Sequence, residues 1–224
     1  MLLLYLNFNH LNINKMKAQR TIYQLIVDRS GSMSDCIDAT INGFNEQLNR
    51  IKGMEAEFPE QDIRVGLTLF NDHTDQKFVG QPVSEMPILT RGNYIPSGST
   101  ALLDSIGQTC SLLRECEYRL SSIPTTFVVV ILTDGYENSS RIYNLEQVRS
   151  LIRELEGTGK WTFSFIGATL DAVDVAAQMS IKAQNSYQFS KSAMKGEVWD
   201  KLSDSMHGYF GKKRSGGDTS NLFD

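Results

Sequence analysis

Short apolar runs alternate along the chain with longer amphipathic segments. In residues 63–70 an aliphatic side chain stands at every second position, the two-residue period of a β-strand with one covered face. Residues 127–132 are apolar at every position, which is typical of a strand covered by helices on both faces. The predicted strands comprise residues 22–27, 63–70, 77–79, 127–132, 161–166 and 186–189. The short run 77–79 follows a polar turn and is expected to be a hairpin partner at one edge.

The segments between these strands have apolar residues at the spacing of an α-helix. Helices are predicted around residues 37–51, 102–113, 145–155, 171–179 and 198–209, each with apolar residues three or four positions apart on one face. Ser34 is expected to cap the first helix, and Asn144 with Gln147 three positions later is typical of a capping box for the third. The order β-α-β-β-α-β-α-β-α-β-α predicts an α/β fold with a mostly parallel sheet wrapped by helices.

Composition and the chain ends narrow the class of protein. The 224 residues are 41% apolar with a formal net charge of −4, which fits one globular domain and argues against a nucleic-acid-binding surface. No apolar run approaches the ~20 residues of a membrane span, and three cysteines are too few for a disulfide framework, so we expect a cytoplasmic protein. We expect an N-terminal extension over residues 1–19, the domain over residues 20–210 and a flexible, glycine-rich polar tail over residues 211–224.

Oxygen-bearing side chains stand where three of the predicted elements meet loops. Asp28, Ser30 and Ser32 follow the first strand. Thr100 precedes the second helix, and Asp134 follows the fully apolar strand. Ligands of parallel α/β sheets bind beyond the carboxyl ends of the strands, so these side chains are expected to converge at one edge. Because the set contains neither His nor Cys, it favours Mg²⁺, Mn²⁺ or Ca²⁺ over zinc or copper.

These residues also resemble a known motif. Asp28-x-Ser30-x-Ser32, Thr100 within Gly-Ser-Thr-Ala-Leu and Asp134 within Leu-Thr-Asp-Gly are similar to the metal-ion-dependent adhesion site of von Willebrand factor A (VWA) domains. The resemblance implies a Rossmann-like three-layer sandwich, with a mostly parallel central sheet, one antiparallel edge strand and helices on both faces. It implies that Ser30 and Ser32 ligate the ion directly and Thr100 directly or through water. Asp28 and Asp134 would act largely through bound waters. The implied ion is Mg²⁺, with Mn²⁺ or Ca²⁺ as alternatives.

The VWA resemblance implies a binding module rather than an enzyme. An Asp or Glu of a partner protein would complete the coordination of the ion. Similarity to stand-alone bacterial or intracellular VWA proteins implies an AAA+ ATPase or an adaptor as that partner. Met33, His73 and Tyr136 lie in or near the ligand loops and are expected to contact it. Asp104, in the first turn of a predicted helix, is expected to be structural.

Two alternatives remain open. A metal-dependent hydrolase, phosphatase-like or esterase-like, is the second functional hypothesis. Against it, a serine rather than a second aspartate stands two positions after Asp28, and the Ser30-Gly31-Ser32 turn is not a Gly-x-Ser-x-Gly nucleophile elbow. In the other alternative, the tail that ends at Asp224 docks into a partner, or into the site of a neighbouring copy, through its terminal carboxylates.

Overall fold

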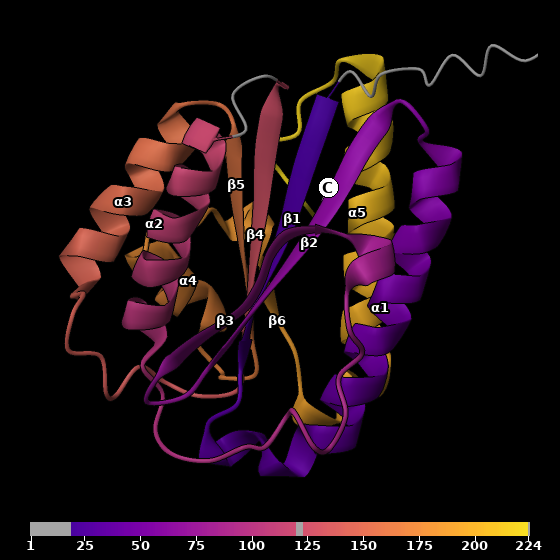
Figure 1. Cartoon of the computed structure of the whole chain (residues 1–224). Helices are drawn as coiled ribbons and strands as arrows, with labels where there is room; N and C mark the ends of the chain where they lie inside the picture. Colours follow the sequence, from indigo (N-terminus) through magenta and orange to yellow (C-terminus); the bar gives the residue numbers. More distant parts are fainter. Residues whose placement is uncertain (1–18, 120–122, 224) are drawn as a thin grey trace, which may run out of the picture.

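Six strands form one sheet between two layers of helices in the computed structural model, which describes residues 19–119 and 123–223 (Figure 1). The strand order across the sheet is β3-β2-β1-β4-β5-β6. Neighbouring strands are parallel except for β2 and β3, which pair antiparallel at one edge. The strands are β1 Gln19–Asp28, β2 Gln61–Phe70, β3 Thr74–Pro82, β4 Thr125–Thr133, β5 Trp161–Gly167 and β6 Ser186–Gln188. This topology confirms the predicted Rossmann-like α/β fold.

The helices cover both faces of this sheet. Within the described residues the α-helices are α1 Ile37–Glu57, α2 Leu102–Arg119, α3 Leu145–Gly157, α4 Ala172–Gln178 and α5 Glu197–Ser215. Figure 1 shows α1 and α5 on one face and α2, α3 and α4 on the other. The order of strands and α-helices is the predicted one. In the same part of the chain, none of the helices combines the length and the apolar character that crossing a bilayer requires.

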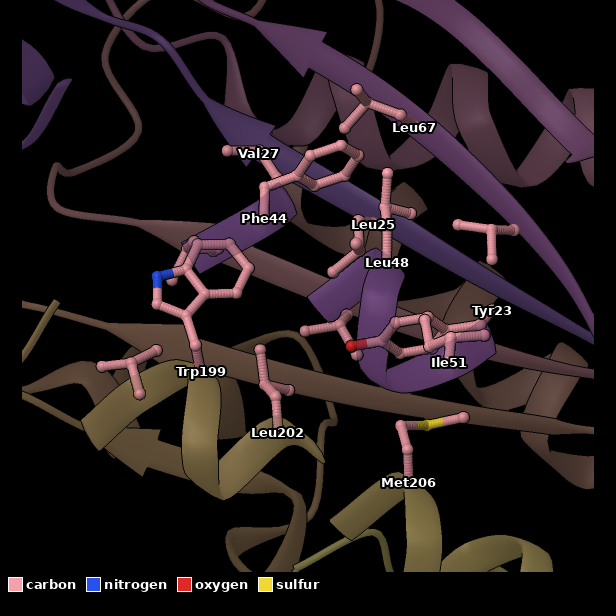
Figure 2. Close-up of a cluster of buried hydrophobic side chains, with 14 of the residues drawn as sticks. Tyr23, Leu25, Val27, Phe44, Leu48, Ile51, Leu67, Trp199, Leu202 and Met206 are labelled. Carbon is pink, nitrogen blue, oxygen red and sulfur yellow. The ribbon is translucent and has the colours of Figure 1, made fainter. Parts of the chain in front are cut away.

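Alternation along β1 sends its side chains into both helical layers. Tyr23, Leu25 and Val27 join the apolar cluster beneath α1 and α5. Ile22 and Ile26 point the other way, into the cluster beneath α2 and α3. Figure 2 shows the first cluster, where β1 meets Phe44, Leu48 and Ile51 of α1 and Trp199, Leu202 and Met206 of α5. Because all five β1 side chains are fully buried, this strand is held rigidly, and its carboxyl end is a fixed support for the loop that follows.

Two local predictions are wrong. The strand β2 was expected to have one covered face, but Thr68 on its polar face is also buried, and its Oγ1 lies 3.1 Å from Thr109 Oγ1 of α2. The polar face therefore packs against a helix through hydroxyl contacts. Ser34 does not cap α1: a 3-10 helix over Gly31–Cys36 precedes α1, and Ser34 Oγ donates to Gly31 O at 2.7 Å. The capping box at Asn144 is confirmed.

The C-terminal segment is ordered against the domain, so the flexible tail predicted from residue 211 is wrong. Helix α5 continues to Ser215 and ends at Gly216, whose φ of 71° is left-handed. Beyond it Leu222 is only 2% exposed, and its N–H donates to Asn185 Oδ1 at 2.6 Å. Asn185 Nδ2 in turn donates to Ser220 O at 2.9 Å. This packing argues against docking of the tail into a partner. The extension expected over residues 1–19 lies outside the described residues, apart from residue 19, which already begins β1.

Candidate metal centre

Asp28 is the last residue of β1 and is completely buried at the carboxyl edge of the sheet. Its Oδ1 accepts a hydrogen bond from Ser30 N, and its Oδ2 accepts one from Thr133 Oγ1 of the neighbouring strand β4, both at 2.6 Å. Burial raises the pKa of Asp28 to about 6, because these hydrogen bonds offset only part of the desolvation and Asp134 adds like charge. The carboxylate is thus fixed in orientation but incompletely compensated.

The loop after β1 brings two hydroxyls to the same edge. Ser30 Oγ lies 3.1 Å from Ser32 Oγ. Ser32 Oγ donates to Asp134 Oδ1 at 2.5 Å, although the two residues are 102 positions apart in sequence. Parallel pairing of β1 with β4 explains this contact, because it places the carboxyl ends of both strands side by side. Four of the five residues expected to hold the ion are therefore joined by contacts around this edge.

The fifth residue, Thr100, lies close to Gly135, the residue after Asp134. A Cβ at this glycine would lie 3.2 Å from Thr100 Oγ1, 3.5 Å from Ser32 Oγ and 3.8 Å from Asp28 Oδ2. Two of these oxygens come from the end of β1 and the loop after it, and the third comes from the loop before α2, so two separate segments meet beside Gly135. The structure thus brings together all five predicted residues.

Backbone contacts hold the loops that carry these side chains. Gly31 N donates to Gly98 O at 3.0 Å, which ties the first loop to the one before α2. Thr100 is clamped by Asn138: its N–H donates to Asn138 Oδ1 at 2.9 Å, and its carbonyl accepts from Asn138 N at 3.0 Å. The buried phenol of Tyr94 donates to Asp28 O at 2.7 Å. The candidate ligands are therefore positioned by a shell of contacts that the motif alone does not contain.

Two acidic residues near the site have structural roles. Asp104 accepts hydrogen bonds from the backbone N–H groups of Arg141, Ile142 and Tyr143 at 2.7–2.9 Å. Glu137 accepts from the backbone N–H of Leu103 and from three groups of residues 139–140. Together they fasten the loop after β4 to the start of α2. The structural role expected for Asp104 is therefore present, although it acts through these loop contacts.

The three residues expected to contact a partner differ in exposure. The expectation for Met33 is wrong for this structure: it is fully buried, because the 3-10 helix after β1 turns its side chain into the core beneath α1. His73 is exposed and lies beside Asp72, with 3.1 Å between Nδ1 and Oδ2. Tyr136 is half exposed, and its phenol donates to Asp171 Oδ1 at 2.9 Å. Two of the three residues therefore lie on the surface.

Lys191 was not predicted and contacts the site directly. It begins a 3-10 helix, Lys191–Lys195, between β6 and α5. Its Nζ lies 2.6 Å from Asp134 Oδ2, and the two groups form an ion pair without the alignment of a hydrogen bond. The same Nζ donates a hydrogen bond to Ser32 O at 3.0 Å. The adjacent Asp134 carboxylate raises the pKa of the Lys191 ammonium. Nothing in the surrounding sequence signals this contact, because it depends on where β6 leaves the sheet.

The donor set fits a hard divalent cation. Across residues 19–119 and 123–223, no three His, Cys, Asp or Glu side chains gather into a metal-binding group. The candidate set instead consists of two carboxylates and three hydroxyls, all oxygen donors of the kind that Mg²⁺, Mn²⁺ and Ca²⁺ prefer. Three of these oxygens, on Thr100, Ser32 and Asp28, lie close together beside Gly135.

The sheet order, the single antiparallel edge and the loop cluster at the carboxyl edge define a VWA-type fold. No family model and no curated protein sequence matches this chain. Solved structures share the fold. The vWF domain of the type V pili tip protein Mfa5 from Porphyromonas gingivalis has a TM-score of 0.53 at 7% identity, with 85% of this chain and 96% of that chain covered. The pilus adhesin SpaC from Lactobacillus rhamnosus GG has a TM-score of 0.61 at 13% identity, with 86% and 30% covered.

Proximal thread matrix protein 1 from the mussel byssus is also similar, with a TM-score of 0.53 at 17% identity. The match covers 86% of this chain and 47% of that protein, so this chain spans about half its length. Another structure of the mussel protein, with a TM-score of 0.50, has a zinc-occupied MIDAS motif, the metal-ion-dependent adhesion site. At these identities the likeness establishes the fold alone. The chain therefore has a VWA fold. The case for its candidate ligands depends on their geometry in this structure.

Proposed function

We propose that this chain is a protein-binding module that captures an acidic side chain of a partner through a divalent cation. The observation that carries the proposal is that Asp28, Ser32 and Thr100 place oxygens close together beside Gly135, while Ser30 and Asp134 contact Ser32. Ser30, Ser32 and Thr100 would hold the ion with their hydroxyls, and Asp28 and Asp134 would support it as buried carboxylates. Mg²⁺ is the proposed ion, with Mn²⁺ or Ca²⁺ as alternatives.

Charge explains why such a site favours an acidic partner. Three of the five candidate ligands are neutral hydroxyls, and one oxygen of Asp134 already faces Lys191. The bound ion would supply positive charge that these residues neutralise only in part. A carboxylate from another protein is a hard, anionic oxygen donor and completes that balance. Binding of this kind needs no bond to be made or broken in the partner, so the proposed module is not an enzyme.

The surface around the site supports recognition of a protein. Leu170, in the loop between β5 and α4, is 90% exposed, and Tyr136 beside the site is half exposed. The hydrogen bond from Tyr136 to Asp171, the residue after Leu170, links the two loops that carry these side chains. Exposed large apolar and aromatic side chains beside a polar centre are typical of interaction surfaces. Leu170 was missed in the sequence because a single loop leucine carries no periodic signal.

The partner class and the location are part of the same proposal. We propose an AAA+ ATPase or an adaptor that presents an Asp or Glu, with His73 and Tyr136 at the rim of the contact. We propose a cytoplasmic location, whereas the similar solved structures include pilus and byssus proteins. Cell fractionation with an antibody against the chain tests the location independently of binding.

The experiment is calorimetric titration of the purified chain with MgCl₂ and MnCl₂, followed by capture of partners from cell extract with added Mg²⁺ or with chelator. The variants are Thr100→Ala and Asp134→Ala, and the matched control is Ser99→Ala, which changes an exposed neighbour of Thr100. We expect the control to bind Mg²⁺ and both site variants to lose binding and Mg²⁺-dependent capture. Equal binding by all variants would overturn the proposal. Turnover of a phosphate or carboxylate ester that is lost in Thr100→Ala would favour the hydrolase instead.

A further inference from the structure

Lys191 places a positive charge at the carboxylate that the proposed cation would share. Asp134 has a completely buried side chain, and its Oδ2 is 2.6 Å from Lys191 Nζ. The same ammonium donates to Ser32 O at 3.0 Å and lies 4.0 Å from Asp35 Oδ2. Lys191 itself keeps 40% of its side chain exposed, and so it is free to move away without unpacking the core.

Two cations cannot share this carboxylate without cost. A divalent ion among the candidate ligands would lie close to the Lys191 ammonium, and like charges a few ångströms apart repel strongly where water is partly excluded. We propose that Lys191 competes with the divalent cation for Asp134, so that the cation binds only as Lys191 leaves. This inference rests on the proposed function, since it concerns the same site.

Other carboxylates lie near Lys191 and could pair with its ammonium once it has left Asp134. Lys191 borders a surface hollow that Leu170, Phe189 and Glu197 also line. Glu197 is exposed, and its Oε1 accepts a hydrogen bond from Tyr187. Asp35, on the other side, is also exposed. Movement of Lys191 toward either group would keep its charge compensated and would change the surface beside Leu170, where the partner is proposed to bind.

The test compares Lys191→Met with Lys195→Met. Both substitutions remove one lysine charge from the same short helix, but Lys195 is exposed on a different hollow of the surface. Each variant and the wild type are titrated with Mg²⁺ and with Mn²⁺ by calorimetry. Their thermal melting is followed with and without the ion. We expect Lys191→Met to bind both ions about tenfold more tightly, an effect of the size expected for loss of an ion pair with one buried partner. Lys195→Met should match the wild type.

A stability readout separates competition from a merely structural role. Lys191→Met leaves Asp134 buried without its cation, so it should melt at a lower temperature than the wild type when no divalent ion is added. Added Mg²⁺ should raise its melting temperature more than that of the wild type, because a ligand that binds the folded state more tightly stabilises it more.

Several outcomes decide the question. Tighter binding in Lys191→Met supports competition, most strongly if the wild type shows no binding at all. Equal or weaker binding in Lys191→Met, with wild-type binding that Asp134→Ala abolishes, overturns the competition and leaves the proposed function intact. Absence of binding in the wild type and in Lys191→Met overturns both. If Lys195→Met binds the ions more tightly to the same extent, the effect comes from the overall charge of the protein, and the proposed competition is also overturned.

Discussion

Alanine at Gly135 should block the proposed cation without unfolding the domain. The glycine follows Asp134 in the loop after β4, and a methyl group there would point among the candidate ligands. It would lie 3.2 Å from Thr100 Oγ1 and 3.5 Å from Ser32 Oγ. The change therefore adds one carbon to the space the proposed ion needs and removes none of its ligands.

The effect on stability should be small because two contributions of similar size oppose each other. Gly135 is not among the residues with positive φ, so alanine can adopt its backbone conformation. Replacing such a glycine stabilises by roughly 0.4–1 kcal/mol through the unfolded chain. The contact with Thr100 is tight by a few tenths of an ångström and offsets this gain. The net change in the free energy of unfolding should therefore stay within about 1 kcal/mol.

The effect on cation binding should be larger. Displacing one hydroxyl from the ion costs on the order of a lost hydrogen bond to a charged group, about 1.5 kcal/mol or more, which is at least tenfold in affinity. Calorimetric titration with Mg²⁺ measures this loss, and urea unfolding measures stability. The matched control is Gly157→Ala, where a Cβ meets no atom within 4 Å. Wild-type Mg²⁺ affinity in a folded Gly135→Ala protein would refute the assignment of the ion to this space.

Three further predictions concern the fold. Val130→Asp buries an unpaired carboxylate in the fully covered strand β4, at a cost of several kcal/mol comparable to the whole stability of a domain, so circular dichroism should show an unfolded chain. Leu222→Ala should cost about 2–4 kcal/mol in urea unfolding, whereas Asn221→Ala should cost little. Burial lowers the pKa of Lys213 from 10.5 to about 8 in the folded state, so on raising the pH the folded protein loses this proton before the unfolded chain does. Stability should therefore rise as the pH increases from about 8 toward 10.5, and Lys213→Met should lack this rise.

The parts of the fold that were predicted correctly are those with strong local signals. The fully apolar strand around Val130 and the capping box at Asn144 each depend on residues close together in sequence. The convergence of Ser32 with Asp134 also followed from sequence, because parallel strands place their carboxyl ends at one edge whatever the lengths of the connections. Burial of β1 and β4 then explains why the motif loops start from fixed points.

The wrong predictions share a different cause. Met33 is expected at a partner surface because it lies beside the ligand loops, and Leu222 falls in a segment expected to be flexible because it is polar and rich in glycine. In the structure both side chains are buried in the core beneath α1 and α5. Asn185 shows the same effect in a polar group: its buried amide is satisfied by the C-terminal segment, far along the chain. Local composition reflects only the neighbours of a residue in sequence. Tertiary packing overrides the burial that this composition predicts wherever a distant segment packs against the residue.

The electrostatic balance of the candidate site is the clearest case of such dependence on distant segments. The motif identifies five oxygen donors, and each could be read from its own loop. The charge on Asp134, however, is compensated by Lys191, which reaches it only because β6 lies at the end of the sheet and the following 3-10 helix turns back over the loop after β1. Glycine, serine and aspartate at motif spacing therefore predict which atoms surround the site. The charge that those atoms present to a cation depends on a residue that only the completed fold brings there.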